Sequence, residues 1–198
     1  MPKIGCITPS KFKAVMTKGR NKSQMWGQTA LTYADELAMN LIGVETPDIS
    51  APALEHGNEL EPFAIQAYEM ENFVEVVKVD KPIHHSELDY VCGTMDGLVS
   101  TDGIIEIKCP FNPLNHFKNI MEAEQYEKLY KWQIQGYLWI TGRQWADFVS
   151  FHTHEAWGDN QLFAHRIERD EDIIQQLQER VPLFWGIVQQ RLNEYLEK

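Results

Sequence analysis

The stretch C-G-T-M-D-G-L-V-S-T-D-G-I-I-E-I-K-C-P at residues 92–110 decides the fold of this chain. A glycine follows Asp96, and the pair Asp102-Gly103 is a strong turn signal. The short segments 98–100 and 104–108 on either side of this turn are predicted to pair as a β-hairpin. The hairpin would carry one carboxylate just before its first strand and two charged side chains on its second.

Residues 104–108 alternate between apolar and charged side chains, and successive strand residues point to opposite faces of a sheet. Glu106 and Lys108 therefore share one face, and Ile105 and Ile107 point into the core. A buried carboxylate and a buried ammonium cost desolvation energy unless they have partners. A divalent cation would be such a partner, although E-I-K also fits a plain surface hairpin.

The residue types suit a magnesium site. Mg²⁺ is a small, hard cation held by one or two carboxylates together with substrate phosphate and water. Asp96 and Glu106 fit this role, and the backbone carbonyl oxygen of Ile107 would add a third ligand. A bound metal lowers the pKa of its water and shields the charge that builds on phosphorus. Lys108 would orient or deprotonate the attacking water and offset charge in the transition state.

The pattern D-G-x(8)-E-x-K-C-P-F, which begins at Asp96, resembles the PD-(D/E)XK nucleases. It is most similar to the phage lambda exonuclease group, the YqaJ-type viral recombination nucleases. Four other blocks precede it or follow it in the order of that group, and the resemblance covers nearly the whole chain. These blocks are I-T-P-S at 7–10, A-L-E-H-G-N-E-L-E-P-F-A at 53–64, and Q-I-Q-G-Y-L-W-I-T with I-E-R-D at 133–141 and 167–170.

The resemblance implies a single-domain α/β fold of the restriction-endonuclease-like PD-(D/E)XK type over residues 1–198. Its central mixed sheet would be flanked by helices, with the active site at one sheet edge. The implied activity is a Mg²⁺-dependent 5′→3′ exonuclease with two ions, for which Mn²⁺ substitutes. It would degrade one strand of linear double-stranded DNA and leave 3′ overhangs for a single-strand annealing protein. A ring-shaped homotrimer and a phage or prophage origin are also implied.

The resemblance also implies residues that bind the DNA end. Ser10 matches the serine of a 5′-phosphate pocket, and Lys3 stands where the group has an arginine. Lysine is a point charge without the bidentate fork of arginine, so this pocket departs from the group's pattern. Arg20 falls where the group reaches into the duplex, and Leu54 matches the apolar wedge that separates the terminal base pair.

Further residues are placed near the metals by the same resemblance. Glu61 would be a third carboxylate, Gln133 would lie beside the scissile phosphate or attacking water, and Tyr130 and Thr94 would contact DNA. From the residues alone, Tyr130, Gln133 and Tyr137 share one face of a predicted helix. Read the same way, Gln133 could instead be a satisfied buried amide and Glu61 a solvated helix charge.

Composition supports one globular domain that acts on nucleic acid. The chain has 198 residues, of which 43% are hydrophobic, and six are tryptophans. The formal net charge is −11, yet residues 1–34 contain six basic side chains and no acidic one. Phosphate backbones bind local basic patches whatever the total charge, so 1–34 is predicted to be a DNA-end-binding arm. A solvated N-terminal segment is the other interpretation.

Cysteine and histidine usage bears on location and on metals. Three cysteines without C-x-x-C spacing argue against a disulfide framework, a zinc ribbon or an iron–sulfur cluster, and favour a reducing cytoplasm, which the resemblance implies is that of a bacterial host cell. The sequence contains no run of about 18 apolar residues, so no membrane span is predicted. His84-His85 and His152-x-His154 could suggest zinc, but we interpret them as exposed histidines, because hard Mg²⁺ does not seek imidazole.

The remaining elements follow from periodicity and from helix and turn signals. Ser10 is a predicted N-cap for a short helix, the helix over 51–72 is predicted to break near Gly57, and the last helix is predicted to be interrupted at Pro182. The predicted helices are 11–16, 23–40, 51–72, 113–120 (or a loop), 122–140 and 170–196, and the predicted strands are 73–79, 145–152 and 161–168.

Three alternatives stay open. A related endonuclease or repair nuclease is one, because Met95 stands where the group's motif often has proline. An inactive DNA-end-binding module is the second, and the intact Asp96, Glu106 and Lys108 argue against it. A zinc-binding interaction protein that uses the histidines is the third.

Overall fold

The computed structural model describes residues 5–21, 24–44 and 52–198, with the backbone alone for residue 126. Lys3 lies outside the described residues. The helices are η1 Pro9–Lys11, α1 Phe12–Met16, α2 Gln28–Leu41, α3 Pro52–Asn72, α4 Pro113–Met121, α5 Ala123–Thr141, η2 Glu155–Gln161 and α6 Glu171–Leu196. The strands are β1 Val76–Lys78, β2 Ile83–His84, β3 Cys92–Gly93, β4 Gly97–Val99, β5 Gly103–Lys108, β6 Trp145–Phe151 and β7 Leu162–Glu168.

The main sheet has five strands in the order β1-β4-β5-β6-β7. β5 and β6 are parallel, and the other neighbouring pairs are antiparallel. The predicted fold class, a mixed sheet flanked by helices, is therefore confirmed. The expectation of a site at a sheet edge is wrong, because β5 is the central strand.

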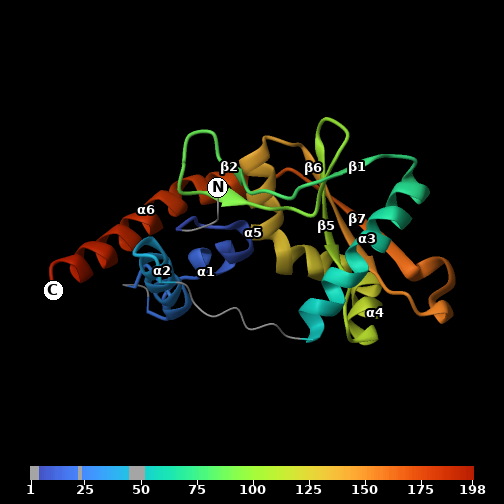
Figure 1. The fold of residues 1–198 in the computed structure, drawn as a ribbon, viewed down its shortest axis with the longest axis horizontal. Coiled ribbons are helices and arrows are strands. Elements are labelled where there is room, and N and C mark those ends of the chain that lie inside the picture. The colour runs from blue at the N-terminus through green and yellow to red at the C-terminus, as the bar shows by residue number, and fades with distance from the viewer. Residues whose placement is uncertain (1–4, 22–23, 45–51) are drawn as a thin grey trace.

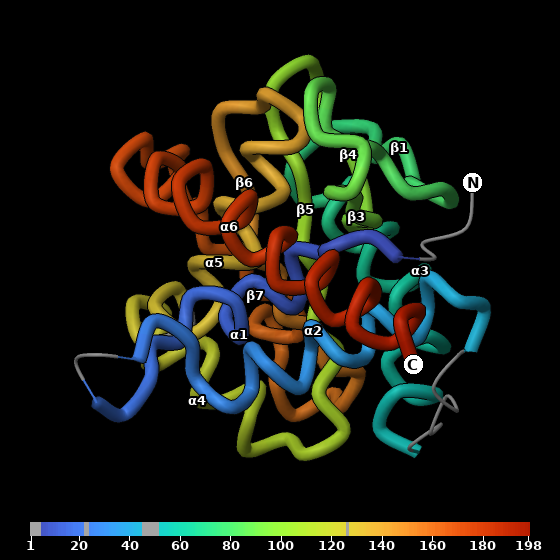
Figure 2. The backbone as a smooth tube through the Cα atoms, turned by 90° about the vertical axis from the view of Figure 1, so that its left-hand side faces the viewer, coloured from blue at the N-terminus to red at the C-terminus, as the bar shows by residue number. Residues whose placement is uncertain are grey.

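Helices cover both faces of the sheet, as Figure 1 shows for α3 and α5. On one face, α3 packs Ala64 and Tyr68 against Ile105 and Ile107 of β5. On the other face, Ile134 and Leu138 of α5 pack against the sheet. A second core joins α1, α2 and α6 to the far side of α5, and Figure 2 shows α6 and α2 side by side in this outer layer.

The predicted hairpin is confirmed as β4 and β5, which pair Leu98 with Ile104 and Val99 with Gly103. Its turn differs from the prediction, because the left-handed backbone falls on Ser100, with φ 50°, and not on the Asp102-Gly103 pair. The guanidinium of Arg143 donates to the carbonyl oxygens of Val99, Ser100 and Gly103 at 3.2, 3.1 and 2.7 Å. A distant arginine thus satisfies the turn that local sequence was expected to define.

Several helix boundaries differ from the predictions. α3 runs without a break past Gly57 and Pro62, and α6 runs through Pro182. Each proline removes one helical hydrogen bond, but the buried faces of these helices outweigh that local loss. Ser10 is not an N-cap, because it lies inside η1, which begins after Thr8.

The other elements are present as predicted, but two of them are shorter than predicted. α2 begins at Gln28, later than the predicted start at 23, and the strand predicted over 73–79 is only Val76–Lys78. The long helix α5 ends before Gly142, which has the left-handed φ of 70° that favours glycine after a helix. Among the described residues, no helix is both long enough and apolar enough to cross a membrane.

Candidate active site

Asp96 lies between β3 and β4, beside the end of the hairpin. Its Oδ2 accepts a hydrogen bond of 2.6 Å from the backbone N–H of Ile107. Gly97 follows, and a Cβ there would lie 2.3 Å from Val76 Cγ1, so only glycine lets β1 pack so closely. The sequence pair D-G thus fixes a carboxylate against the backbone of β5.

Glu106 is in the centre of β5, and only 3% of it is exposed. Its Oε1 accepts hydrogen bonds of 2.5 Å from Lys108 Nζ and from Gln133 Nε2. Its Oε2 is buried and has no hydrogen-bond partner among the described residues. The predicted alternation is confirmed, because Glu106 and Lys108 share the α5 face while Ile105 and Ile107 pack under α3.

The charges of this cluster do not balance within the protein. Burial and the negative charge of Glu106 raise the pKa of Asp96 to about 7, while the Ile107 N–H and Lys108 act in the opposite direction. Burial lowers the pKa of Lys108, but the charge and hydrogen bond of Glu106, together with Asp96, raise that pKa above its usual range. Two carboxylates therefore face one ammonium in a buried site.

This donor set fits a divalent cation. A buried carboxylate oxygen without a partner is costly, and Glu106 Oε2 is such an atom. Asp96, Glu106 and the carbonyl of Ile107 offer the oxygen ligands that a hard cation such as Mg²⁺ prefers. Asp96, Glu106 and Ile107 thus lie together in space, and Oε2 of Glu106 is not bonded by any of the described residues.

The predicted face of α5 lies over the site. Besides its bond to Glu106, Gln133 Nε2 lies 3.4 Å from the Tyr137 hydroxyl, which donates to the Thr94 carbonyl at 3.1 Å. Lys108 Nζ lies 5.3 Å from the centre of the Tyr130 ring. Gln133, which is half-buried, therefore links α5 to the carboxylate of Glu106.

Glu61 lies at the rim of this cluster, on α3. Its carboxylate forms an ion pair of 2.8 Å with Lys78 Nζ, and its charge contributes to the raised pKa of Asp96. This ion pair uses Oε1 of Glu61.

The N-terminal segment lies beside the strand that leads to Asp96. Ile7 forms a parallel bridge with Val91, and a Cβ on Gly93 would come within 3.0 Å of Pro9. Ser10 is exposed, and its Oγ lies 3.1 Å from the hydroxyl of Thr8.

Two of the predicted DNA contacts lie elsewhere on the surface. Arg20 is exposed and lines a hollow with Lys18, Gln24 and Trp26. Leu54 is 51% exposed on α3. Neither residue contacts the Asp96 and Glu106 cluster in the described part of the chain.

Sequence reasoning missed a second buried carboxylate, Asp147 of β6, which is 4% exposed. It accepts from the Tyr68 hydroxyl at 2.6 Å and from Arg166 at 2.8 and 2.9 Å. The available signal was an aspartate within the apolar run W-A-D-F-V-S-F of a predicted strand.

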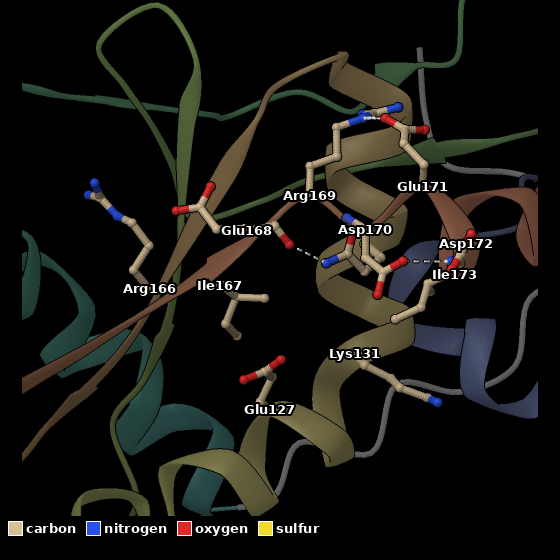
Figure 3. A pocket seen from close by; sticks show the side chains of 11 residues that line it. Glu127, Lys131, Arg166, Ile167, Glu168, Arg169, Asp170, Glu171, Asp172 and Ile173 are labelled. Atoms are coloured by element: carbon tan, nitrogen blue, oxygen red, sulfur yellow. Dashed lines mark hydrogen bonds and ion pairs between the residues drawn. The ribbon is translucent and has the colours of Figure 1, made fainter.

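A surface hollow between α5, β7 and the start of α6 is shown in Figure 3. Its polar groups are paired with each other: Gln135 bridges the Glu168 carbonyl and the Asp170 N–H, and Arg169 pairs with Glu171. Most of its other charges are acidic, so this hollow does not suit a phosphate.

Comparison with known proteins defines the class of this chain. The alkaline exonuclease LHK-Exo from Laribacter hongkongensis has a similar structure, with a TM-score of 0.85, 33% identity, and coverage of 98% of this chain and 93% of that one. The same enzyme in complex with dAMP gives a TM-score of 0.84, 34% identity and the same coverage. A phage-related exonuclease from Haemophilus somnus 129PT shares the fold at 22% identity, with a TM-score of 0.78 over 96% of both chains. This chain is a deoxyribonuclease.

The family follows from the sequence profile of the YqaJ-like viral recombinase domain, which matches residues 3–144. The chain belongs to this family. No curated protein sequence matches the chain significantly.

Proposed function

We propose that this nuclease is a Mg²⁺-dependent exonuclease that degrades one strand of linear double-stranded DNA in the 5′→3′ direction. The observation that carries the proposal is the buried Oε2 of Glu106, which lies near Asp96 and Lys108 and has no hydrogen-bond partner in the described part of the chain. A buried carboxylate oxygen without a partner destabilises the fold, and a metal bound by this cluster would satisfy it.

Asp96, Glu106 and the Ile107 carbonyl would hold the metal, and Glu61 would add a carboxylate if a second ion binds. When bound, Mg²⁺ supplies a more acidic water and shields the charge on phosphorus. Mn²⁺ also accepts oxygen ligands and is expected to replace it.

Lys108 is held by Glu106, and its raised pKa keeps it an ammonium. In this state it orients the attacking water and offsets transition-state charge, which favours this role over proton abstraction. Gln133 holds Glu106 in place from α5 and lies where the scissile phosphate would approach. Tyr130, over the ammonium of Lys108, would border the DNA together with Thr94.

For recognition of the DNA end, we propose the N-terminal segment. Ser10 and Thr8 present two hydroxyls to solvent near the strand that carries Asp96, and Lys3 would add positive charge to a 5′-phosphate. Arg20 would contact the duplex, and the exposed Leu54 would act as the wedge at the terminal base pair.

The similar structures support an exonuclease over an endonuclease. LHK-Exo is named an alkaline exonuclease, and its complex holds dAMP, a deoxynucleoside monophosphate such as exonucleases release. Family membership supports action in viral recombination. We extend the proposal on this basis to 3′ overhangs, a single-strand annealing partner, a homotrimer and a bacterial host cytoplasm.

The decisive test is degradation of linear duplex by Asp96→Asn and Lys108→Ala. Both variants should lose about 10³-fold or more in rate, as when one transition-state-stabilising group is removed, while binding to DNA ends in Ca²⁺ persists. Asp102→Asn and Lys118→Ala are matched controls that should keep the wild-type rate. Undiminished cleavage by either site variant would remove the assignment.

Two substrates then test the finer claims. Covalently closed plasmid should survive and linear DNA should release mononucleotides, whereas nicked circles would favour the endonuclease alternative. Removal of label from 5′ ends before 3′ ends would support the polarity. A faster rate on 5′-phosphorylated than on 5′-hydroxyl ends, reduced in Ser10→Ala, would support the phosphate pocket, and equal rates would discard it.

A further inference from the structure

Away from the carboxylates, a second cluster of metal-binding side chains lies where three chain segments meet. The ligand atoms of Cys6, His84 and Cys92 all lie within 4.8 Å of one another. His84 of β2 is the direct partner of Cys92 on β3, and the bridge between Ile7 and Val91 brings the neighbouring Cys6 alongside. Backbone pairing therefore brings Cys6 next to His84 and Cys92, which are far from it in the sequence.

The histidine is oriented as a metal ligand would be. Its Nδ1 lies 3.2 Å from the carbonyl oxygen of Asp89, which accepts a hydrogen bond from it, and Nε2 is left for a ligand role. Metal-binding histidines in proteins are usually fixed in this way by a second hydrogen bond. His84 is at the surface, so an ion can reach the cluster from solvent.

The two cysteines supply soft donors inside the protein. Cys6 is 7% exposed and Cys92 is fully buried. The hydrogen bond with Cys92 and the nearby His84 lower the pKa of Cys6 to about 7, while burial and Asp89 act in the opposite direction. The third cysteine, Cys109, lies outside the cluster, and burial raises its pKa to about 12.

We propose that Cys6, His84 and Cys92 bind one zinc ion through two thiolates and one imidazole, with a fourth position open to water. In tetrahedral zinc sites two ligand atoms lie about 3.5 to 3.8 Å apart, so separations within 4.8 Å close with small side-chain shifts. Binding releases the thiol protons to solvent. Thiolate and imidazole favour zinc, whereas the Asp96 and Glu106 oxygens favour Mg²⁺, so the two sites select different metals.

The consequence is a metal clip on the N-terminal segment. Cys6 precedes Thr8 and Ser10, and Cys92 precedes Thr94 and Asp96 on β3. An ion that joins the two cysteines would hold the segment that carries the hydroxyls against the strand that leads to the catalytic aspartate. This inference does not depend on the proposed exonuclease function.

The test uses Co²⁺, a spectroscopic substitute for zinc, added to the full-length, reduced protein in excess Mg²⁺. The Mg²⁺ occupies the carboxylate site, and only thiolate ligands give the sulfur-to-cobalt charge-transfer band. We expect this band, with the visible bands of tetrahedral cobalt, to saturate at one equivalent and to disappear when Zn²⁺ is added. A protein with three titratable thiols that gives no band would overturn the proposal.

Variants assign the ligands. Cys6→Ser and Cys92→Ser should each abolish most of the charge-transfer band, and His84→Gln should weaken cobalt binding at least 10-fold. Cys109→Ala and His165→Gln, which alter a cysteine and a strand histidine outside the cluster, should keep the band. An unchanged band in Cys6→Ser or Cys92→Ser would refute the ligand assignment. Circular dichroism identifies any variant that does not fold.

Two measurements on the wild-type chain need no variant. Zn²⁺ at about 100-fold above its Kd should raise Tm by about 5 to 10 °C in Mg²⁺ buffer, because it binds only the folded state. It should also slow alkylation of Cys6, located by mass spectrometry. Unchanged Tm and unchanged alkylation, or a Cys6–Cys92 disulfide that persists in reductant, would contradict the proposal.

Discussion

Glu106 and Asp147 are two buried carboxylates on the adjacent parallel strands β5 and β6, and their surroundings differ sharply. Both are almost inaccessible, with exposures of 3% and 4%. Asp147 faces α3, where Tyr68 and Arg166 donate three hydrogen bonds to its two oxygens. Glu106 faces α5, and both Lys108 Nζ and Gln133 Nε2 donate to its Oε1. Its Oε2 has no hydrogen-bond partner among the described residues.

We propose that this difference separates a structural carboxylate, Asp147, from a metal-binding one, Glu106. A fully paired buried charge fastens neighbouring elements together, and here it links α3, β6 and β7. A half-paired one is costly to the fold and is expected where a ligand completes its coordination. The number of filled oxygen positions, more than burial, distinguishes the two.

The largest effect should come from Glu106→Gln. It removes a metal ligand, so nuclease activity should fall about 10³-fold or more. Metal-free stability should change by no more than about 1 kcal/mol, because an unpaired anionic oxygen is lost together with the charge partner of Lys108. Activity assays and urea unfolding measure the two quantities. Glu75→Gln, at an exposed glutamate, is the control, and a large loss of stability in Glu106→Gln would make Glu106 a structural residue.

Asp147→Asn should behave in the opposite way. It should lower the free energy of unfolding by about 2 to 3 kcal/mol, less than for a fully buried ion pair because half of Arg166 is exposed. Activity per folded molecule should stay near wild type. Urea unfolding compared with exposed Asp159→Asn measures this loss. If the variant had normal stability but no activity, Asp147 would belong to the active site, and the proposed difference between Asp147 and Glu106 would be refuted.

Gln133→Leu tests whether the donor from α5 positions Glu106. Loss of a residue that orients a metal ligand typically costs about 10- to 100-fold in metal affinity or activity. The Mg²⁺ concentration for half-maximal activity should rise, and a high Mg²⁺ concentration should restore part of the rate. Gln125→Leu, at an exposed position of the same helix, is the control. A lower rate with no change in Mg²⁺ dependence would assign Gln133 to substrate contact instead.

The smallest effect concerns His116, a buried neutral group that resembles Asp147 in being fully paired. Its ring nitrogens contact the Ser150 hydroxyl and the Asn160 carbonyl, each at 2.8 Å. Burial lowers the pKa of His116 below 6.5. The unfolded chain therefore takes up a proton first as pH falls below 6.5, and stability declines by at most about 1.4 kcal/mol per pH unit. His116→Gln should flatten this decline in urea unfolding at pH 5 to 7, whereas exposed His154→Gln should not.

Local sequence predicted the hairpin, the strand alternation at Glu106 and Lys108, and the one-faced placement of Tyr130, Gln133 and Tyr137. These features depend on residues within one or two elements, where periodicity and turn signals act. The fold class is also confirmed, because the motif blocks specify a family. The roles of the site residues remain predictions.

What the sequence could not predict depends on partners far along the chain. Arg143 satisfies the hairpin turn, and Tyr68 with Arg166 satisfies Asp147, and no local pattern indicates such pairs. The breaks predicted at Gly57 and Pro182 failed for the same reason, because tertiary burial outweighs helix propensity. Cys6, His84 and Cys92 likewise meet only through strand pairing.

The parallel pairing of β5 with β6 has a consequence during synthesis. Asp96, Glu106 and Lys108 all leave the ribosome before α4 and α5, the crossover that such a pair requires. Until that crossover closes, Glu106 lacks Gln133 and the face of β5 that carries it is not covered by α5. A nascent chain of this length would contain the proposed metal ligands but not the helix that holds Glu106 in place. Nuclease activity would therefore be expected only late in translation.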